Sequence, residues 1–285
     1  MIVVKSLSNI DFDKLFEAFS LAFAEYEITL NKEELGKMLT RRGFSAELSF
    51  GAFDGGRLVS FTFNGIGTFN GIKTAYDTGT GTLKEYRGQG LASRVFNESI
   101  PSLVKAGVKQ YLLEVLQDNT SAVSVYKKQG FEVSREFNYF VQDMNGLTLK
   151  PRNIPEDIVV EEISLGELES IEGWFDFSPS WQNSFEAINR KPDDFIVIGA
   201  RKDKRLVAYG IIEPSTGDIT QIAVEKNYRR KGIGTAILNV IVENNKYGRV
   251  KLINSEISCF SITHFLESNG ISLKGKQFEM IKSLS

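Results

Sequence analysis

The chain has 285 residues, of which 42% are hydrophobic and 25% are charged, and its 34 basic and 36 acidic residues give a net charge of −2. This length suits two domains, and the composition is that of a globular protein rather than a disordered or fibrous one. The evenly mixed charges create no field that would attract nucleic acid, and one cysteine (Cys259) and one histidine (His264) exclude an intrachain disulfide and a His/Cys metal cluster. We expect no metal and no nucleic-acid partner.

No stretch of the sequence reaches the roughly 20 consecutive apolar residues that cross a bilayer. Residues 1–8 have neither the basic start nor the long apolar stretch of a secretory signal. We therefore expect a cytoplasmic protein without a membrane partner.

The two halves of the chain begin alike. A short strand followed by an amphipathic helix is predicted at residues 2–4 and 12–23, and again at residues 158–160 and 165–174. Further on, the glycine of Gln129-Gly130-Phe131 has a counterpart in Asn269-Gly270-Ile271. Features that recur in the same order indicate two copies of one domain.

A connection between the two copies is expected near the middle of the chain. Asn145-Gly146 is a turn sequence, and two prolines follow at Pro151 and Pro155. Turn residues and prolines together are typical of a domain linker. We predict domains at residues 1–146 and 156–285, joined by a linker at about 147–155.

Each copy contains a run of predicted strands that leads into a loop. In the second half these strands are residues 195–200, 206–212 and 219–224, separated by charged or glycine-containing turns. The first half has the same layout at residues 48–53, 58–63 and 73–83. We expect an antiparallel meander in each copy.

The loop after the meander has the sequence Arg-x-x-Gly-x-Gly/Ala in both halves and precedes an apolar-periodic helix. Its defining residues are Arg87, Gly90 and Ala92, and then Arg229, Gly232 and Gly234. Small residues let the backbone approach a ligand closely, and the free N–H groups and positive dipole end of a helix N-terminus attract anions. Neither loop has the glycine spacing of a dinucleotide-binding fold or the Gly-Lys-Ser/Thr of a nucleotide-triphosphate loop. The pattern predicts binding of a pyrophosphate.

At these residues the sequence resembles the GNAT superfamily of acyltransferases, whose signature is Arg/Gln-x-x-Gly-x-Gly/Ala after the fourth strand. The segment from Ile222 to Gly234 is especially similar to that loop. In the first half the loop is joined by a second signature, a strand from Tyr111 to Val115 followed by Asn119, Tyr126 and Gly130. The resemblance covers essentially the whole chain in two tandem copies.

The resemblance implies an α/β (α+β) fold of two tandem domains, each with a mixed, largely antiparallel bent sheet flanked by helices. It also implies that acetyl-CoA lies where the fourth and fifth strands separate, with its pyrophosphate on the loop amides and its pantetheine arm along the fourth strand. The residues implied to bind it are Thr82, Leu83, Arg87, Gly88, Gln89, Gly90, Leu91, Ala92, Ser93 and Asn119 in the first half and Ala223, Val224, Arg229, Arg230, Lys231, Gly232, Ile233, Gly234 and Thr235 in the second.

Tyr126 stands at the family's tyrosine position, which implies that it is the acid that protonates the leaving thiolate; the alternative is a core tyrosine packed on Ala122. Asn119 either binds the pantetheine or caps the following helix. For a general base, Asp77, Glu85, Glu114 and a chain of waters are all open.

The second half lacks both side chains, because Leu266 and Cys259 stand where the first half has Tyr126 and Asn119. It could bind the acyl donor, form substrate walls, or only support the first half. Its loop, in turn, carries more cationic side chains.

The expected function is acetyl-CoA-dependent N-acetyl transfer to a primary amine of a small molecule or a protein by direct attack. The alternatives are a non-catalytic acyl-CoA-binding or regulatory module and a transferase of another acyl group. The partners would be acetyl-CoA and an amine-bearing acceptor, whose pocket would form around residues 19–29 and 175–183 with Trp174 and Trp181 as walls. The protein would be a monomer or a homodimer.

Overall fold

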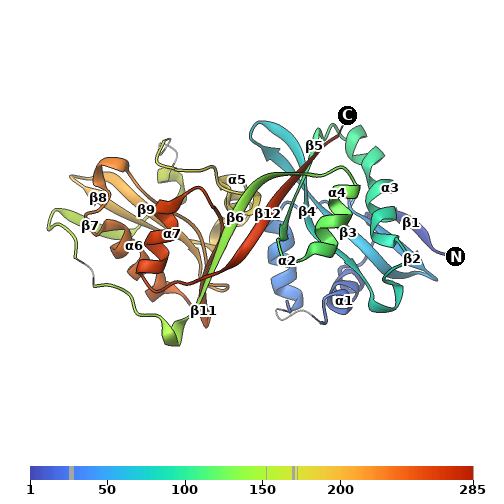
Figure 1. The fold of residues 1–285 in the computed structure, drawn as a ribbon, viewed down its shortest axis with the longest axis horizontal. Helices are drawn as coiled ribbons and strands as arrows, with labels where there is room; N and C mark the ends of the chain where they lie inside the picture. Colours follow the sequence, from blue (N-terminus) through green and yellow to red (C-terminus); the bar gives the residue numbers. More distant parts are fainter. Residues whose placement is uncertain (26–28, 152, 169–170, 172, 285) are drawn as a thin grey trace. The chain divides into compact units, whose positions relative to one another are not determined.

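The computed structural model describes residues 1–25, 29–151, 153–168, 171 and 173–284 (Figure 1). It divides into two compact units. The first unit contains Met1–Ser134, Phe185–Arg190 and Phe278–Ser285, and the second contains Arg135–Ser184 and Lys191–Gln277. Among the described residues, no helix is long and apolar enough to cross a membrane.

The sheet of the first unit has the strand order β1-β2-β3-β4-β5, and the end of β12 lies beside β5. The first four strands are antiparallel neighbours, whereas β4 and β5 are parallel. Its elements are β1 (Val3–Ser6), α1 (Phe12–Ala22), α2 (Lys32–Arg41), β2 (Phe50–Asp54), β3 (Arg57–Phe69), β4 (Ile72–Thr82), α3 (Leu91–Lys105), β5 (Gln110–Leu116), α4 (Thr120–Lys128) and, from later in the chain, α5 (Phe185–Asn189).

The second unit repeats this arrangement in the order β7-β8-β9-β10-β11, with β6 beside β11. Here too the first four strands are antiparallel, and β10 and β11 are parallel. Its elements are β6 (Glu132–Asp143), β7 (Ile158–Glu162), β8 (Ile196–Lys202), β9 (Arg205–Glu213), β10 (Asp218–Val224), α6 (Ile233–Asn244), β11 (Arg249–Glu256), α7 (Phe260–Ser268) and β12 (Leu273–Ser283), of which β6 begins and β12 ends in the first unit. The predicted fold class, two mixed α/β units of the same design, is confirmed.

Each sheet is completed by a strand from the other repeat. The strand that follows α4, β6, pairs with β11 from Arg249↔Asp143 to Glu256↔Phe137. The strand that follows α7, β12, lies beside β5, and Leu284 donates its N–H to the Lys109 carbonyl at 2.8 Å. Met280 and Leu284 of β12 belong to the same core cluster as Tyr111 and Phe131 of the first repeat. The core of the first unit is therefore built from both ends of the chain.

The predicted linker at residues 147–155 stays a prediction. The two compact units do not divide the chain at these residues. Residues 147–155 fall inside the second unit, while the units part between Ser134 and Arg135. Sequence reasoning assumes that a domain is continuous along the chain, so it cannot detect an exchanged strand.

The two parallel strand pairs separate early. β4 and β5 pair only from Thr74↔Gln110 to Tyr76↔Leu112, and β10 and β11 pair at Asp218↔Lys251. Just beyond these pairs each fourth strand has a β-bulge, at Thr78 and at Thr220, whose hydroxyls donate to the Phe63 and Ile211 carbonyls at 3.1 and 3.3 Å. A bulge leaves one residue unpaired and bends its strand. Each unit therefore has a fork between two parallel strands.

The exchanged strand gives a test. We expect a fragment of residues 1–146 to aggregate, because it lacks Met280, which is fully buried, and leaves the edge of β5 bare. Fusing residues 278–285 to this fragment through a flexible linker should restore cooperative unfolding, measured by circular dichroism. The control is the same fusion with Met280→Glu, which should fail. Equal cooperative unfolding of the fragment with and without the added strand would contradict the exchange.

Candidate functional site

Both predicted pyrophosphate loops lie directly before a helix. Gly90 and Gly232 are the N-cap residues of α3 and α6, with left-handed φ angles of 73° and 80°. Two residues earlier, Gly88 has φ 76° and its counterpart Arg230 has φ 63°. This turn directs the first N–H groups of each helix outward, where they can bind an anion.

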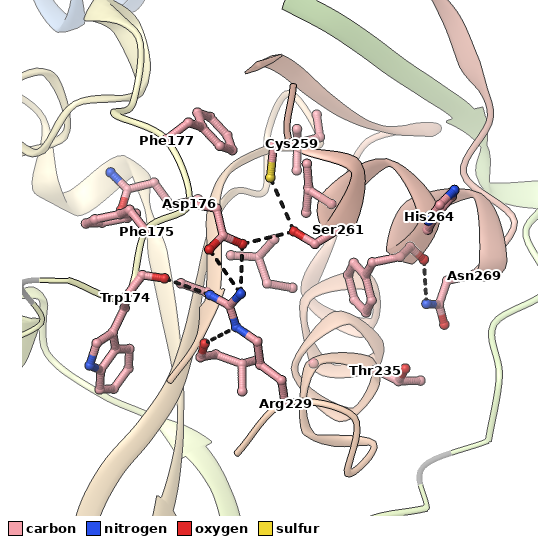
Figure 2. A pocket seen from close by; sticks show the side chains of 18 of the residues that line it. Trp174, Phe175, Asp176, Phe177, Arg229, Thr235, Cys259, Ser261, His264 and Asn269 are labelled. Atoms are coloured by element: carbon pink, nitrogen blue, oxygen red, sulfur yellow. Dashed lines mark hydrogen bonds and ion pairs between the residues drawn. The ribbon is translucent and has the colours of Figure 1, made fainter. Parts of the chain in front are cut away.

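The two loop arginines have the same three kinds of contact. Each guanidinium donates to the carbonyl at the end of its own fourth strand, to a carbonyl from the segment after the unit's first strand, and to a carboxylate. For Arg87 the partners are Thr82 at 3.2 Å, Ala22 at 2.9 Å and Glu25 at 2.7 Å, and for Arg229 they are Val224 at 2.9 Å, Trp174 at 3.0 Å and Asp176 at 2.8 Å (Figure 2). Both side chains thus tie the loop to the rest of the unit. The predicted role of the two arginines in binding acetyl-CoA stays a prediction.

The remaining predicted loop residues divide into buried and accessible ones. Leu91 and Ile233 begin their helices and point into the cores, and Leu83 is also buried. Ala92 and Ser93 are partly buried in the first turn of α3, Thr82 shares a hydrogen bond with Ser60, Gln89 donates to the Glu85 carbonyl, and Lys231 lies over the Tyr228 ring at 5.2 Å. Their roles in binding acetyl-CoA stay predictions.

The loops differ in what covers them. Among the described residues, a Cβ atom at Gly88 or Gly90 would meet nothing within 4 Å. A Cβ atom at Gly232 would lie 1.9 Å from the carbonyl oxygen of Asn153. The first loop is therefore open, and the second is covered on one side by residues of the predicted linker.

Tyr126 lies in the fork of the first unit. Its hydroxyl donates to Oδ2 of Asp77 at 3.4 Å, and its ring packs on Phe131 with the ring centroids 5.6 Å apart. Asp77 comes directly after Tyr76, the last residue of β4 that pairs with β5. Tyr126 thus packs on the core and also directs its hydroxyl to a carboxylate, and its role as the acid stays a prediction.

Asp77 is a partly buried carboxylate. Burial raises its pKa from 3.8 to about 6, against the opposing effects of hydrogen bonds from the Thr80 hydroxyl, the Gly79 N–H and the Tyr126 hydroxyl, and of the Arg42 guanidinium. The Thr80 and Gly79 bonds are 2.8 and 2.9 Å long. A carboxylate with a pKa near neutrality can both take and release a proton at working pH.

The other two carboxylates proposed as a base are placed differently. Glu85 is exposed and pairs with Arg57 at 3.0 Å, outside the fork. Glu114 on β5 accepts from the hydroxyl of Tyr76 at 3.1 Å. Asp77 is the candidate that contacts Tyr126.

Asn119 is the N-cap of α4, and its side-chain oxygen accepts from the Ala122 N–H at 3.2 Å and from the Ser121 hydroxyl at 3.0 Å. Of its two predicted roles, the cap is present. Binding of pantetheine stays a prediction.

The fork of the second unit opens into a cavity of about 440 Å³. Its walls are β10 and β11, helices α6 and α7, and residues 174–177 and 179 (Figure 2). The predicted residues that line it are Ala223, Val224, Arg229, Arg230, Gly232, Gly234 and Thr235. The structure thus brings most of the second-half predictions to one cavity.

The second fork lacks the acid and the carboxylate. Leu266 is fully buried where α4 has Tyr126, and the residue before the bulge is Ile219 where the first unit has Asp77. A neutral pair lies behind the bulge, where the Tyr209 hydroxyl donates to Gln221 at 2.7 Å and Gln221 donates to the Asn183 carbonyl at 2.6 Å. The carboxylate that lines the cavity, Asp176, pairs with Arg229 and accepts from Ser261. Among the described residues, the positions equivalent to Tyr126 and Asp77 therefore hold apolar side chains.

The predicted acceptor pocket stays a prediction, and its two tryptophans are placed differently. Trp174 lines the cavity, whereas Trp181 is 2% exposed in the core. Residues 26–28 of the predicted first-half wall lie outside the described residues. Within the described part of the chain, no group of three or more His, Cys, Asp or Glu side chains could hold a metal.

The two N-cap glycines should respond differently to alanine. Gly90→Ala has room for the new Cβ and should lose about 1 kcal/mol from its left-handed φ alone, whereas Gly232→Ala should lose clearly more because the Cβ overlaps the Asn153 carbonyl. Urea unfolding of the two variants checks this. Equal losses would mean that residues 147–155 do not rest on the second loop.

A pH test addresses Asp77. Because its pKa is raised in the folded protein, its protonated form favours folding below about pH 4, and this contribution is lost as the pH rises through 6. Asp77→Asn removes the titration. The melting temperature of the variant, relative to that of the wild type, should therefore rise between about pH 4 and pH 7. A difference that stays constant with pH would contradict the raised pKa.

Comparison with known proteins gives the family. The GNAT acetyltransferase family model matches residues 12–131 and 162–249, which are most of the chain. In fold the chain is similar to a tandem GNAT protein from the clavulanic acid biosynthesis pathway, at 12% identity, with a TM-score of 0.76 over 100% of this chain and 99% of that one. It is also similar to a GCN5-related N-acetyltransferase from Sphaerobacter thermophilus, at 14% identity, with a TM-score of 0.72 over 99% of this chain and 96% of that one.

Two curated proteins are similar in sequence. They are N-alpha-acetyltransferase MAK3 of Arabidopsis thaliana, 28% identical over 36% of this chain, and N-alpha-acetyltransferase 30 of Schizosaccharomyces pombe, 30% identical over 33%. The matches span 55% and 65% of the length of these relatives. The family model matches a segment in each half of the chain and so settles the class: the chain belongs to the GNAT acetyltransferase family, whose acyl donor is acetyl-CoA.

Proposed function

We propose that the first unit transfers the acetyl group of acetyl-CoA to a primary amine of a small molecule or a protein. The observation that carries this proposal is the contact between the Tyr126 hydroxyl and the Asp77 carboxylate in the fork, beside the open loop of Gly88 and Gly90. Amine attack on a thioester requires an acid for the leaving thiolate and a base for the amine proton, and this pair supplies both.

The proton transfers balance within the pair. The amine nitrogen forms a bond to the thioester carbonyl carbon, the C–S bond breaks, and Tyr126 gives its proton to the thiolate. Asp77 takes the proton that the nitrogen loses. Because Tyr126 and Asp77 are in direct contact, Asp77 then returns this proton to the phenolate, and both residues regain their starting states.

The names of the curated relatives suggest which acceptor amines to test first. The two curated relatives are named N-alpha-acetyltransferases, which supports an α-amino group as one acceptor. Since each match covers about a third of this chain, free amino acids and small amines belong in the same substrate panel.

A specific observation favours a second function for the second unit. Ile219 and Leu266 occupy the positions of Asp77 and Tyr126, yet the cavity beside them is about 440 Å³. We propose that this unit binds an acyl-CoA or CoA without transferring the acyl group. Transfer of an acyl group other than acetyl by the first unit is tested with the same assay and other thioesters.

Replacing the acid should separate chemistry from binding. Tyr126→Phe should lower kcat for thiol release by about a hundredfold or more, with the dissociation constant for acetyl-CoA within about twofold of the wild type, because the hydroxyl acts only on the leaving group. Asp77→Asn should lower kcat similarly, and the double variant should be little worse than either single one. Thiol release with a panel of amines is the measurement.

The control is Tyr247→Phe, which changes an exposed tyrosine of the second unit and should leave kcat unchanged. If wild type releases no thiol with any amine, the proposed function fails. If wild type is active and Tyr126→Phe keeps its kcat, acetyl transfer stands and the pair is not its acid and base.

A further inference from the structure

Residues 147–151 and 153–154, here called the connecting segment, pass over both helices that border the cavity of the second unit. Gly270, just after α7, faces Thr148, whose carbonyl oxygen would lie 3.3 Å from a Cβ atom at Gly270. On α6, Asn239 donates to the Lys150 carbonyl at 3.2 Å. At the loop, the Asn153 carbonyl lies against Gly232. The segment thus runs from the end of α7, along the first turns of α6, to the pyrophosphate loop.

The connecting segment is anchored rather than loosely draped. Leu147, Leu149 and Ile154 pack on the core cluster of the second unit, which includes Ile233, Ile237 and Leu266. These apolar anchors fix the course of the described residues of the segment. Lys150, which follows Leu149 directly, is therefore held at the edge of the cavity.

Lys150 lies between the anchors and lines the cavity. The Asn239 amide that holds its carbonyl also donates to the carbonyl of Thr235, one helical turn nearer the loop, at 2.7 Å. One turn is about 5.4 Å, a distance that the four-carbon stem of lysine can span. The ammonium can therefore reach an anion held at the N-terminus of α6.

Of the two arginines of the loop, Arg230 lines the cavity, whereas Arg229 has its guanidinium occupied by other partners. The Arg229 guanidinium is engaged by Asp176, Trp174 and Val224 (Figure 2). A phosphate bound at the loop thus receives backbone N–H groups from α6 but not the charge of Arg229. Lys150 supplies a cation from a different part of the chain.

A second polar group of the cavity lacks a partner. Asn269 is 1% exposed and lines the cavity; its amide donates to the Phe265 carbonyl at 2.8 Å, while its side-chain oxygen is buried without a hydrogen bond (Figure 2). A buried acceptor left unpaired costs about 1–3 kcal/mol. A ligand with an N–H or O–H donor would satisfy it.

From these contacts we propose that the connecting segment is a third wall of a ligand site in the second unit, and that Lys150 binds the phosphate end of a pyrophosphate-bearing ligand there, with Asn269 accepting a hydrogen bond from its uncharged part. The site goes beyond acetyl transfer in the first unit, because it needs neither Tyr126 nor Asp77. The first loop, with nothing within 4 Å of Gly88 or Gly90, has no equivalent cover in the described residues.

The test is calorimetric titration with CoA in a Gly90→Glu background, which places a carboxylate at the anion site of the first loop and leaves the second site to be read alone. Lys150→Ala should weaken CoA binding about tenfold, and Lys150→Glu more. The loss should shrink at high salt, because it reflects a charge on a phosphate. Inorganic pyrophosphate should compete with CoA in the parent and compete less well in Lys150→Glu.

The matched control is Lys274→Glu, which reverses an exposed lysine of β12 that does not line the cavity and should leave affinity within about twofold. Equal affinity of the Lys150→Glu and Lys274→Glu proteins would overturn the role of Lys150, and no CoA binding in the Gly90→Glu parent would overturn the site. The inference rests on the proposed CoA binding by the second unit: a lack of binding in the parent would overturn both, whereas equal affinity of the two lysine variants would overturn only the role of Lys150. Acetyl transfer by the first unit is read separately, as thiol release by the protein with an intact first loop.

Discussion

The early separation of two parallel strands is the constraint on which both sites depend. β4 and β5 part after Tyr76, and the residue that follows, Asp77, pairs with Asn64 of β3 on one side and faces the fork instead of β5 on the other. The bulges at Thr78 and Thr220 lie at this point in both units. In each, the hydroxyl of the bulged threonine donates to a carbonyl of the neighbouring strand. The fourth strand then leads through the loop to the N-terminus of a helix. The same stretch of chain therefore places a side chain in the fork and presents backbone amides to an anion.

The loop arginines explain how this geometry is held. Arg87 and Arg229 each join the end of the fourth strand to the segment after the first strand, using two carbonyls and one carboxylate. Guanidinium donors suit this task, since their fixed fork can satisfy several acceptors at once. Lys84 and Arg87 also hold the pKa of Glu25 below its usual range, so this tie stays ionised at neutral pH. The arginine of the signature thus positions the loop, and the amides are left to meet the ligand.

Much of this arrangement was predictable from local sequence. The helix starts after Gly90 and Gly232, the paired strands and the positions of Tyr126 and Leu266 all follow from short-range patterns of glycine and apolar spacing. The contact of Asp77 with Tyr126 joins residues 49 positions apart, so no spacing rule could favour Asp77 over Glu85 or Glu114. The exchange of β6 and β12 was equally hidden, because each strand pairs with a strand of the other repeat and not with its neighbour in the sequence. The residue that holds the Lys150 carbonyl, Asn239, lies on α6, 89 positions further along the chain.

The two forks differ by a coupled pair of substitutions, and burial explains the coupling. Asp77 tolerates its position because Thr80, Gly79 and Tyr126 donate to it. Without the phenol, a buried carboxylate would lose a donor, and without the carboxylate, the Tyr126 hydroxyl would lose the acceptor it has in the fork. Ile219 with Leu266 avoids both costs, whereas either mixed pair would leave a polar group short of a partner. The second fork therefore lacks the phenol and the carboxylate together, while its loop and its cavity remain.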